Sequence, residues 1–289
     1  MIAADDPRIA YVNGDFVPLV DAKVSVLDRG FLFADGVYEV TAVIDGKLID
    51  HAGHLARLER SLGEIEMDHP VPLDTLTDLE LELARRNDLN EGGIYLQVTR
   101  GAAERDFAYP KNTKPTLVMF TQPKKLVDDP RADAGIEVIT TPDLRWKRRD
   151  IKSVAMIAQT IAKQEATKAG ASEAVMVEDG VVTEGSSSTV WMVKDGKLIT
   201  RQLSNSVLPG VTRRSALALC EEQGLEVEER TYTVEELHEA DEVFLTAATS
   251  LVIPIVKVDD RVMSNGAPGP TSMRLRQLYL DMARKTAVG

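Results

Sequence analysis

The sequence predicts an α+β fold in two domains, and three observations lead to this prediction. The chain has 289 residues with 44% hydrophobic and 28% charged content, as in ordinary globular proteins. Because single cores stop growing at roughly 250 to 300 residues, two domains are favoured over one. The first half reads as strands with inserted helices, and the polar stretch at residues 122–135 contains two prolines and no periodicity. We therefore expect an N-terminal small domain at 1–121, an interdomain linker at 122–135 and a larger domain at 136–289.

The first half is expected to contain two β-hairpins and two helices. Asn13-Gly14 and Asp45-Gly46 are typical of tight hairpin turns, so residues 11–17 and 38–49 are predicted as paired strands. Leucines at positions 73, 76, 79 and 83 are three or four residues apart and indicate one face of a helix. The other predicted elements are helices at residues 54–65 and 73–86 and strands at residues 94–99 and 116–121.

The second half is expected to mix strands and helices. Glu178-Asp179-Gly180 and Asp195-Gly196 indicate two further hairpins, and Gly224 is a good C-terminal stop for the helix before it. The predicted elements are a strand at residues 136–141, helices at residues 154–169, 212–223 and 272–285, and a strand at residues 242–245, which is the last strand signal of the chain.

Composition and charge favour small-molecule chemistry. The formal charge of −12 argues against a nucleic-acid surface, because phosphate binding depends on clustered Lys and Arg. None of the four histidines has the spacing of a zinc site, so no metal is expected. The single cysteine, Cys220, lies in an apolar stretch and is predicted to be a buried thiol. Residues 1–6 show no targeting signal and no apolar run reaches ~18 residues, so we expect a cytoplasmic protein outside membranes.

Lys152 and the start of one predicted helix are candidates for chemistry. Lys152 follows Arg148 and Arg149, and neighbouring cations favour the neutral amine that forms a Schiff base. The same cluster is also typical of a solvated basic patch. Gly210-Val211-Thr212 precedes a helix, where several free backbone amides make an anion site or simply a helix start.

Glu184 and Arg57 are the other two candidates. Glu184 lies in a run of small hydroxyl residues that holds a carboxylate in a cleft or forms a plain polar turn. Arg57 adds a charge to a phosphate site, although an exposed arginine on a helix is the ordinary case. Together, an amine nucleophile, a carboxylate for a ring nitrogen and an anion site are the parts that a pyridoxal site requires.

Eight sequence motifs extend over nearly the whole chain. In order they are DRGFLFADGVYE, HLARL, QVTRG, RWKRRDIKS, KQEA, VTEGSSS, LPGVTR and FLTAATS. This series resembles the D-amino acid transaminases of pyridoxal-phosphate fold type IV. RWKRRDIKS followed by TEGSSS about thirty residues later is a specific pairing, much stronger than a short glycine motif. The resemblance implies a homodimer of two-domain chains, each with a small N-terminal α/β domain and a larger C-terminal domain with a β-barrel-like core and helices.

The resemblance also implies pyridoxal 5'-phosphate as cofactor and gives roles to individual residues. Lys152 would form the Schiff base (aldimine) and act as general acid and base. Glu184 would keep the pyridine nitrogen protonated. The cofactor-binding residues implied are Arg57, Lys152, Glu184, Ser187, Leu208, Gly210, Val211, Thr212, Ala248 and Thr249, and Arg145 is expected near the phenolic oxygen of the cofactor.

For the substrate, the resemblance implies a carboxylate site made by Tyr38 and Arg105, with Val40 and Phe107 beside them. An Arg clamp fixes the pose for proton transfer. The loop that carries Arg105 is expected to reach the active site of the neighbouring subunit. Phe107 replaces a histidine of the well-known bacillary pattern, which removes a hydrogen-bond donor worth ~1 to 3 kcal/mol unless apolar packing offsets it. Ala247 and Ala248 replace hydroxyl residues near the phosphate.

The function expected from this resemblance is transamination between D-amino acids (D-alanine, D-glutamate) and 2-oxo acids (2-oxoglutarate, pyruvate). Arg105 favours the D-amino acid substrates. Branched-chain and (R)-amine transaminases remain alternatives on the same fold, followed by aminodeoxychorismate lyase. A binding protein without turnover is disfavoured because the chain keeps the complete set of expected site residues. These are Lys152, Glu184 and Arg57 for the cofactor and Tyr38 and Arg105 for the substrate carboxylate.

Overall fold

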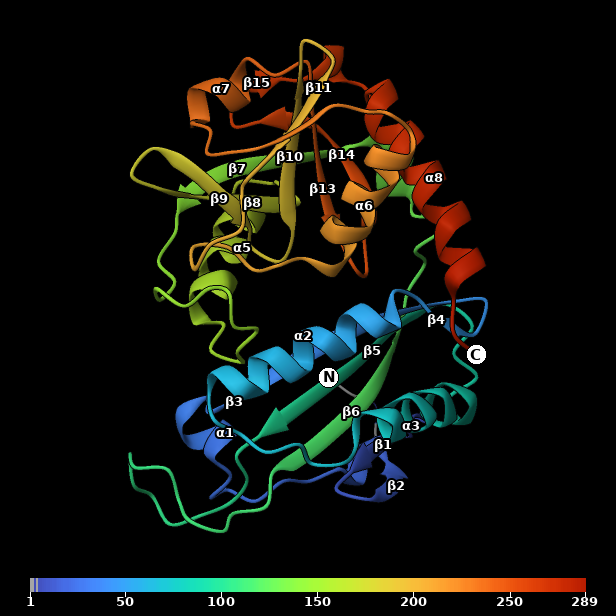
Figure 1. Cartoon of the computed structure of the whole chain (residues 1–289), viewed down its shortest axis with the longest axis vertical. Helices are drawn as coiled ribbons and strands as arrows, with labels where there is room; N and C mark the ends of the chain where they lie inside the picture. The colour runs from blue at the N-terminus through green and yellow to red at the C-terminus, as the bar shows by residue number, and fades with distance from the viewer. Residues whose placement is uncertain (1–2, 4) are drawn as a thin grey trace. The chain divides into compact units, whose positions relative to one another are not determined.

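The computed structural model describes residue 3 and residues 5–289 (Figure 1). Residues 1, 2 and 4 lie outside the described residues. They belong to the N-terminal stretch in which the sequence predicts no targeting segment. The chain divides into two compact units. Unit 1 comprises Met1–Leu126, Ile151–Ala155 and Thr286–Gly289, and unit 2 comprises Val127–Asp150 and Met156–Lys285. The first change of unit falls inside the stretch for which the sequence predicts the linker.

Unit 1 is built on a six-stranded antiparallel sheet of order β2-β1-β6-β5-β3-β4. Its strands are β1 (Ile9–Val12), β2 (Asp15–Pro18), β3 (Gly36–Ile44), β4 (Lys47–Leu48), β5 (Gly92–Thr99) and β6 (Thr116–Pro123). Both predicted hairpins are confirmed. Asn13 and Gly14, like Asp45 and Gly46, all have positive φ, as the tight turns of β-hairpins require.

Two long helices pack on the sheet of unit 1. They are α2 (His51–Glu64) and α3 (Leu73–Arg86), and α3 has the predicted bounds. Leu58 and Leu62 of α2 and Leu76 and Leu83 of α3 are at most 1% exposed and share one core with β3 and β5. Each such leucine contributes roughly 1.5 to 3 kcal/mol to stability. The short α1 (Arg29–Phe33), which the sequence analysis did not predict, begins with Asp28 accepting a hydrogen bond from the Gly30 amide.

Unit 2 contains a nine-stranded mixed sheet of order β12-β11-β10-β13-β14-β7-β8-β9, with β15 paired to β14. Because β9 also lies against β10, the sheet is curled, in agreement with the expected barrel-like core. The strands are β7 (Ile136–Pro142), β8 (Glu173–Glu178), β9 (Val181–Gly185), β10 (Thr189–Lys194), β11 (Lys197–Thr200), β12 (Val227–Glu229), β13 (Glu242–Ala247), β14 (Leu251–Val258) and β15 (Arg261–Val262).

The prediction that residues 242–245 carry the last strand was wrong, because β14 and β15 follow it. Pro254 lies within β14 and weakened the strand signal, since proline cannot donate to a sheet. It pairs with Phe244 of β13, while β7 pairs with β14 only from Ile255 onward. The missing N–H therefore falls where β14 has one paired neighbour.

The helices of unit 2 lie close to their predicted positions, with two additions. The three expected ones are α5 (Ile157–Lys168), α6 (Val211–Glu222) and α8 (Pro270–Thr286), and the additions are α4 (Pro130–Ala134) and α7 (Val234–His238). α4 lies in the stretch predicted as an irregular connection. It forms because the Asp129 side chain caps the Arg131 amide and Pro130 occupies the first turn. Among the described residues, no helix is long and apolar enough to cross a membrane.

Candidate functional site

Lys152 lies in a short segment that pairs with the beginning of β3. The Tyr38 amide donates to the Lys152 carbonyl at 3.0 Å, and the Val154 amide donates to the Gly36 carbonyl at 3.0 Å. The Lys152 Nζ lies 4.1 Å from the centre of the Tyr38 ring. Within the described part of the chain, no carboxylate forms an ion pair with Lys152. The backbone of unit 1 therefore fixes a lysine amine against an aromatic face and leaves it without a counter-ion.

Arg57 is buried rather than exposed, contrary to the ordinary case for a helical arginine. Its guanidinium binds Glu39 through both carboxylate oxygens, at 2.8 and 2.7 Å, and His54 Nδ1 lies 2.7 Å from the same carboxylate. Burial alone would raise the pKa of Glu39, but Arg57 and His54 lower it to about 2. The group is thus a fixed, ionised pair that holds the guanidinium in one orientation.

The predicted substrate residues fall into two contact groups of unit 1. Alternation along β3 places Glu39 towards α2 and puts Tyr38 and Val40 on the opposite face, where Val40 pairs with Tyr95 of β5. The Tyr38 ring stacks on Tyr95 at 5.6 Å. Arg105 and Phe107 are exposed on the loop between β5 and β6.

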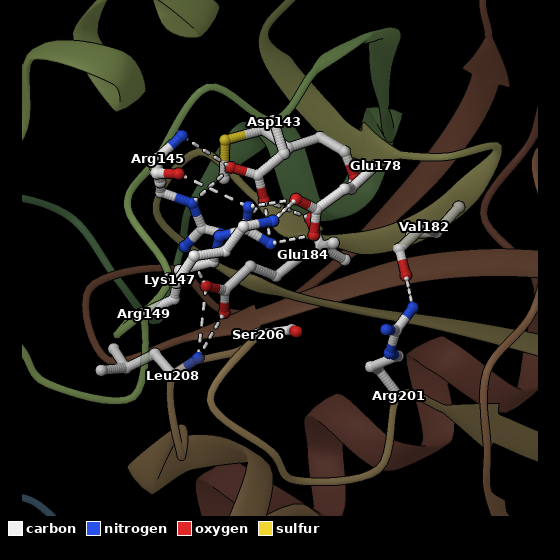
Figure 2. A network of polar contacts seen from close by, with 12 residues as sticks. Asp143, Arg145, Lys147, Arg149, Glu178, Val182, Glu184, Arg201, Ser206 and Leu208 are labelled. Atoms are coloured by element: carbon white, nitrogen blue, oxygen red, sulfur yellow. Dashed lines mark hydrogen bonds and ion pairs between the residues drawn. The ribbon is translucent and has the colours of Figure 1, made fainter.

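Glu184 lies at the centre of a buried network of charges in unit 2 (Figure 2). Arg145 forms an ion pair with Glu184 and binds Asp143 through two bonds of 2.9 and 2.6 Å. The Leu208 amide lies 3.2 Å from each oxygen of the Glu184 carboxylate. Burial raises the pKa of Glu184, whereas Arg145 and the Leu208 amide oppose this shift. Glu184 is therefore a buried carboxylate whose ionised form depends on Arg145 and the Leu208 amide.

The arginines that precede Lys152 are occupied by carboxylates. Arg148 pairs with Asp150 at 3.0 Å, and Arg149 binds Glu178 at 2.8 and 3.0 Å. Figure 2 shows the Arg149 and Glu178 pair beside the Glu184 network. From the sequence, we expected the positive charges of these arginines to favour the neutral form of the Lys152 amine. In the structure each of the two arginines already has a counter-ion close by.

The beginning of α6 has the form expected of an anion site. Gly210 is the N-cap residue, and no side chain caps the first turn of this helix, which starts at Val211. Val211 and Thr212 are buried, so their backbone lies within unit 2. A side chain at Gly210 would meet the Thr189 Oγ1 at 2.8 Å, which explains why glycine stands there. The amides of a first turn without a side-chain cap are available to an anion.

The other predicted cofactor residues lie on loops of unit 2. Ser187 is exposed and donates to Glu173 at 3.3 Å. Ala248 and Thr249 lie in the turn between β13 and β14, which a hydrogen bond from the Ser250 amide to the Ala247 carbonyl closes. In the described part of the chain, no group of three or more His, Cys, Asp or Glu side chains is arranged to hold a metal.

The sequence analysis did not single out two residues of these networks, Glu39 and Asp143. Glu39 could have been recognised from the sequence, because it is a charged residue inside a largely apolar strand. Asp143 left no such signal, since an aspartate after a proline at a strand end is typical of any turn. Arg145 was expected near the phenolic oxygen of the cofactor, and the structure shows its contacts with Glu184 and Asp143.

Comparison with known proteins gives consistent results. The family model of the class IV aminotransferases matches residues 36–258. A D-alanine aminotransferase of Staphylococcus haemolyticus is 38% identical over 270 residues, which cover 92% of this chain and 95% of that protein. A D-alanine aminotransferase of Bacillus licheniformis is 39% identical over 264 residues, covering 91% and 93%.

Solved structures resemble the whole chain. The branched-chain amino acid aminotransferase of Escherichia coli superposes with a TM-score of 0.89 at 24% identity, covering 96% of this chain and 95% of that one. This likeness concerns the fold alone. A second branched-chain amino acid aminotransferase, solved with pyridoxamine 5'-phosphate, has a TM-score of 0.88 at 26% identity, covering 96% and 94%.

Proposed function

Because this chain belongs to the class IV aminotransferases, we propose that it transfers amino groups between D-amino acids, such as D-alanine and D-glutamate, and 2-oxo acids, such as 2-oxoglutarate and pyruvate. The observation that carries the proposal is identity of 38% and 39% to D-alanine aminotransferases along more than nine-tenths of the chain. The similar solved structures are branched-chain amino acid aminotransferases of lower sequence identity to this chain. They support the fold, and we therefore propose D-amino acids, the substrates of the more similar relatives, as the preferred substrates.

The cofactor is pyridoxal 5'-phosphate, and the residues present fit it. Unit 1 holds an amine without a counter-ion at Lys152, and unit 2 holds a buried carboxylate at Glu184 and a first helical turn without a side-chain cap at Gly210. When bound, this group withdraws electrons from the carbon that loses its proton. The chain supplies the binding groups, the orientation and the proton transfer.

Lys152 is the catalytic residue of this proposal. Its amine would hold the cofactor and, once free, would move the proton to and from the substrate Cα. Contact with the Tyr38 ring restricts where the amine moves. Glu184 would hold the ring nitrogen of the cofactor in its protonated form, and Arg145 and the Leu208 amide stabilise the ionised form of Glu184. The side chain of Leu208 would pack on the cofactor ring.

The phosphate is assigned to Arg57 and to the backbone around α6. Glu39 orients the Arg57 guanidinium, while the amides of Val211 and Thr212 point out of a helix start that favours anions. Ser187, Ala248 and Thr249 complete the group of cofactor residues. In this assignment the backbone of the turn at Ala248 replaces the hydroxyl groups of the bacillary pattern.

The substrate carboxylate is assigned to Tyr38 and Arg105, with Val40 and Phe107 beside it. The proposal includes a homodimer in which the loop that carries Arg105 contributes to the active site of the neighbouring subunit. It also includes a cytoplasmic location. In this proposal, the molecules that the enzyme binds are amino acids and 2-oxo acids.

Half-reaction kinetics test the proposal. The holoenzyme is mixed with D-alanine, L-leucine or (R)-1-phenylethylamine, and the loss of the cofactor's absorbance band is followed. The fastest conversion is expected with D-alanine. Faster conversion with L-leucine would assign the chain to branched-chain substrates, and faster conversion with the amine would assign it to (R)-amines.

Two lysine variants test the role of Lys152. Lys152→Ala is expected to lose conversion entirely, and Lys147→Ala is its matched control because the Lys147 side chain is 84% exposed and pairs with Glu178. Full activity of Lys152→Ala would refute the mechanism.

A further inference from the structure

The loop that presents Arg105 is joined to α1 by backbone hydrogen bonds. The Arg29 amide donates to the Gly101 carbonyl at 2.9 Å, and the Ala103 amide donates to the Leu27 carbonyl at 3.2 Å. Gly101 has φ +90°, and a Cβ there would meet the Lys114 carbonyl oxygen at 2.0 Å. The two ends of the loop therefore approach too closely at this point for any residue but glycine.

The guanidinium of Arg29 binds the tip of the same loop. Its side chain is only 4% exposed, and its Nη1 donates to the carbonyl of Asp106 at 2.5 Å. Longer contacts reach the carbonyls of Ala108 at 3.4 Å and Phe107 at 3.5 Å. One buried cation thus faces three successive carbonyl groups that directly follow Arg105.

Asp35 fixes Arg29 and connects it to a second arginine. The Asp35 carboxylate accepts from Arg29 Nε at 2.7 Å and from Arg100 Nε at 2.8 Å. Arg100 also donates to the carbonyls of Ile65 and Glu66 after α2 and lies 3.6 Å from the centre of the Tyr109 ring. The loop is therefore held to the body of unit 1 at both sides of Phe107.

Arg105 itself is held by aromatic rings and not by a carboxylate. Its guanidinium carbon lies 5.3 Å from the Phe33 ring centre and 5.6 Å from that of Phe107, and the two rings are 5.4 Å apart. Among the described residues, none pairs its charge. Cation–π contact orients a guanidinium without neutralising it, so this arginine is free to pair with an external anion.

We propose that Arg29 is a positioning residue for substrate recognition: it fixes the loop so that Arg105 is presented to the α-carboxylate of the substrate. The inference rests on the proposed function, because it assigns Arg105 to that carboxylate. It goes further in naming a buried arginine on which discrimination between carboxylate and non-carboxylate amines depends. Phe107 takes part as an aromatic support for Arg105 in place of a hydrogen-bond donor.

The test compares D-alanine with D-alaninamide, which lacks the carboxylate, in half-reactions of the holoenzyme. Arg29→Met is expected to raise the half-saturating concentration of D-alanine by roughly 10- to 100-fold, as a misplaced binding group does, and to leave that of D-alaninamide unchanged. Arg105→Met is expected to show the same selective loss. Arg86→Met is the matched control, since Arg86 lies over the Phe16 ring, as Arg29 lies over the Phe33 ring, and each arginine pairs with an acid. Within the described residues, Arg86 has no contact with the loop.

A second measurement follows the loop in the cofactor-free protein. Hydrogen–deuterium exchange at residues 103–109 is expected to be faster in Arg29→Met than in the wild type and unchanged in Arg86→Met. If Arg29→Met does not fold, Arg29→Lys keeps a charge near Asp35 but loses the planar set of donors, and the same selective loss is expected.

The outcomes separate the inference from the function on which it rests. A selective loss in Arg105→Met with wild-type behaviour in Arg29→Met would overturn the positioning role and leave the proposed function intact. Equal losses for both substrates in Arg29→Met would also overturn it, because they indicate general damage. Wild-type behaviour of Arg105→Met would remove the carboxylate site itself, and the inference with it.

Discussion

Replacing Arg145 with methionine tests whether this arginine keeps Glu184 ionised. The Arg145 side chain is 7% exposed and contacts the buried carboxylates of Glu184 and Asp143. Removing one partner from a buried ion pair costs about 3 to 5 kcal/mol, because the other charge is left without compensation. Without the Arg145 guanidinium, the pKa of Glu184 rises further.

The sign of the pH dependence follows from that rise. A carboxyl whose pKa is raised on folding contributes its full stability below its unfolded pKa and loses it as the pH rises through the folded pKa. The stability deficit of Arg145→Met is therefore expected to be smaller at pH 5 than near pH 8, where it approaches about 3 to 5 kcal/mol. Asp143 adds a deficit that is already present at pH 5, because Arg145 helps to lower its pKa in the wild type and a lowered pKa stabilises the fold at every pH above the unfolded value.

Urea unfolding of the cofactor-free protein at pH 5 and pH 8 measures this deficit. Tryptophan fluorescence reports on unit 2, since both tryptophans, Trp146 and Trp191, belong to it. Arg131→Met is the matched control: Arg131 pairs with Asp129 two residues before it, as Arg145 does with Asp143, but its side chain is 39% exposed. Its loss is expected to stay below about 1 kcal/mol at both pH values.

Adding Glu184→Gln to Arg145→Met is expected to restore part of the lost stability at pH 8, because the uncompensated charge disappears. A deficit that is equal at pH 5 and pH 8, or no recovery in the double variant, would refute the reasoning.

Two further predictions concern buried groups outside the proposed catalytic residues. Burial raises the pKa of Glu80 to about 8, so the wild type should lose roughly 3 to 5 kcal/mol of stability between pH 5 and pH 9 through this group, and Glu80→Gln should remove that loss in urea unfolding. Groups facing it are His51, 3.1 Å away, Thr41 and the negative Glu39, and none supplies a compensating cation, because burial lowers the pKa of His51 to about 4. An equal pH response in both proteins would contradict the assignment. Burial likewise raises the pKa of Cys220 to about 11, so an aromatic disulfide reagent at pH 8 should react with this thiol only after denaturant is added, and rapid labelling of the native protein would show that the thiol is accessible.

Local chemistry is what the sequence by itself determined. The hairpins at Asn13-Gly14 and Asp45-Gly46 were predictable because few residues accept positive φ, and α3 was predictable because its leucines repeat with the helical period. The series of motifs around Lys152 and Glu184 indicated the family, and the family model and the relatives agree with it. These signals lie within short stretches of chain, so no knowledge of distant contacts was needed.

Only the tertiary structure decided which charges face one another. Arg57 had the pattern of an exposed helical arginine, but packing of α2 on β3 buries it against Glu39. Asp143 and Glu184 are 41 residues apart and meet at one arginine, and Arg29 reaches the carbonyl of Asp106 across 77 residues of chain. A buried ion pair depends on burial and on distance in space, and neither quantity is encoded in the spacing of residues along the chain.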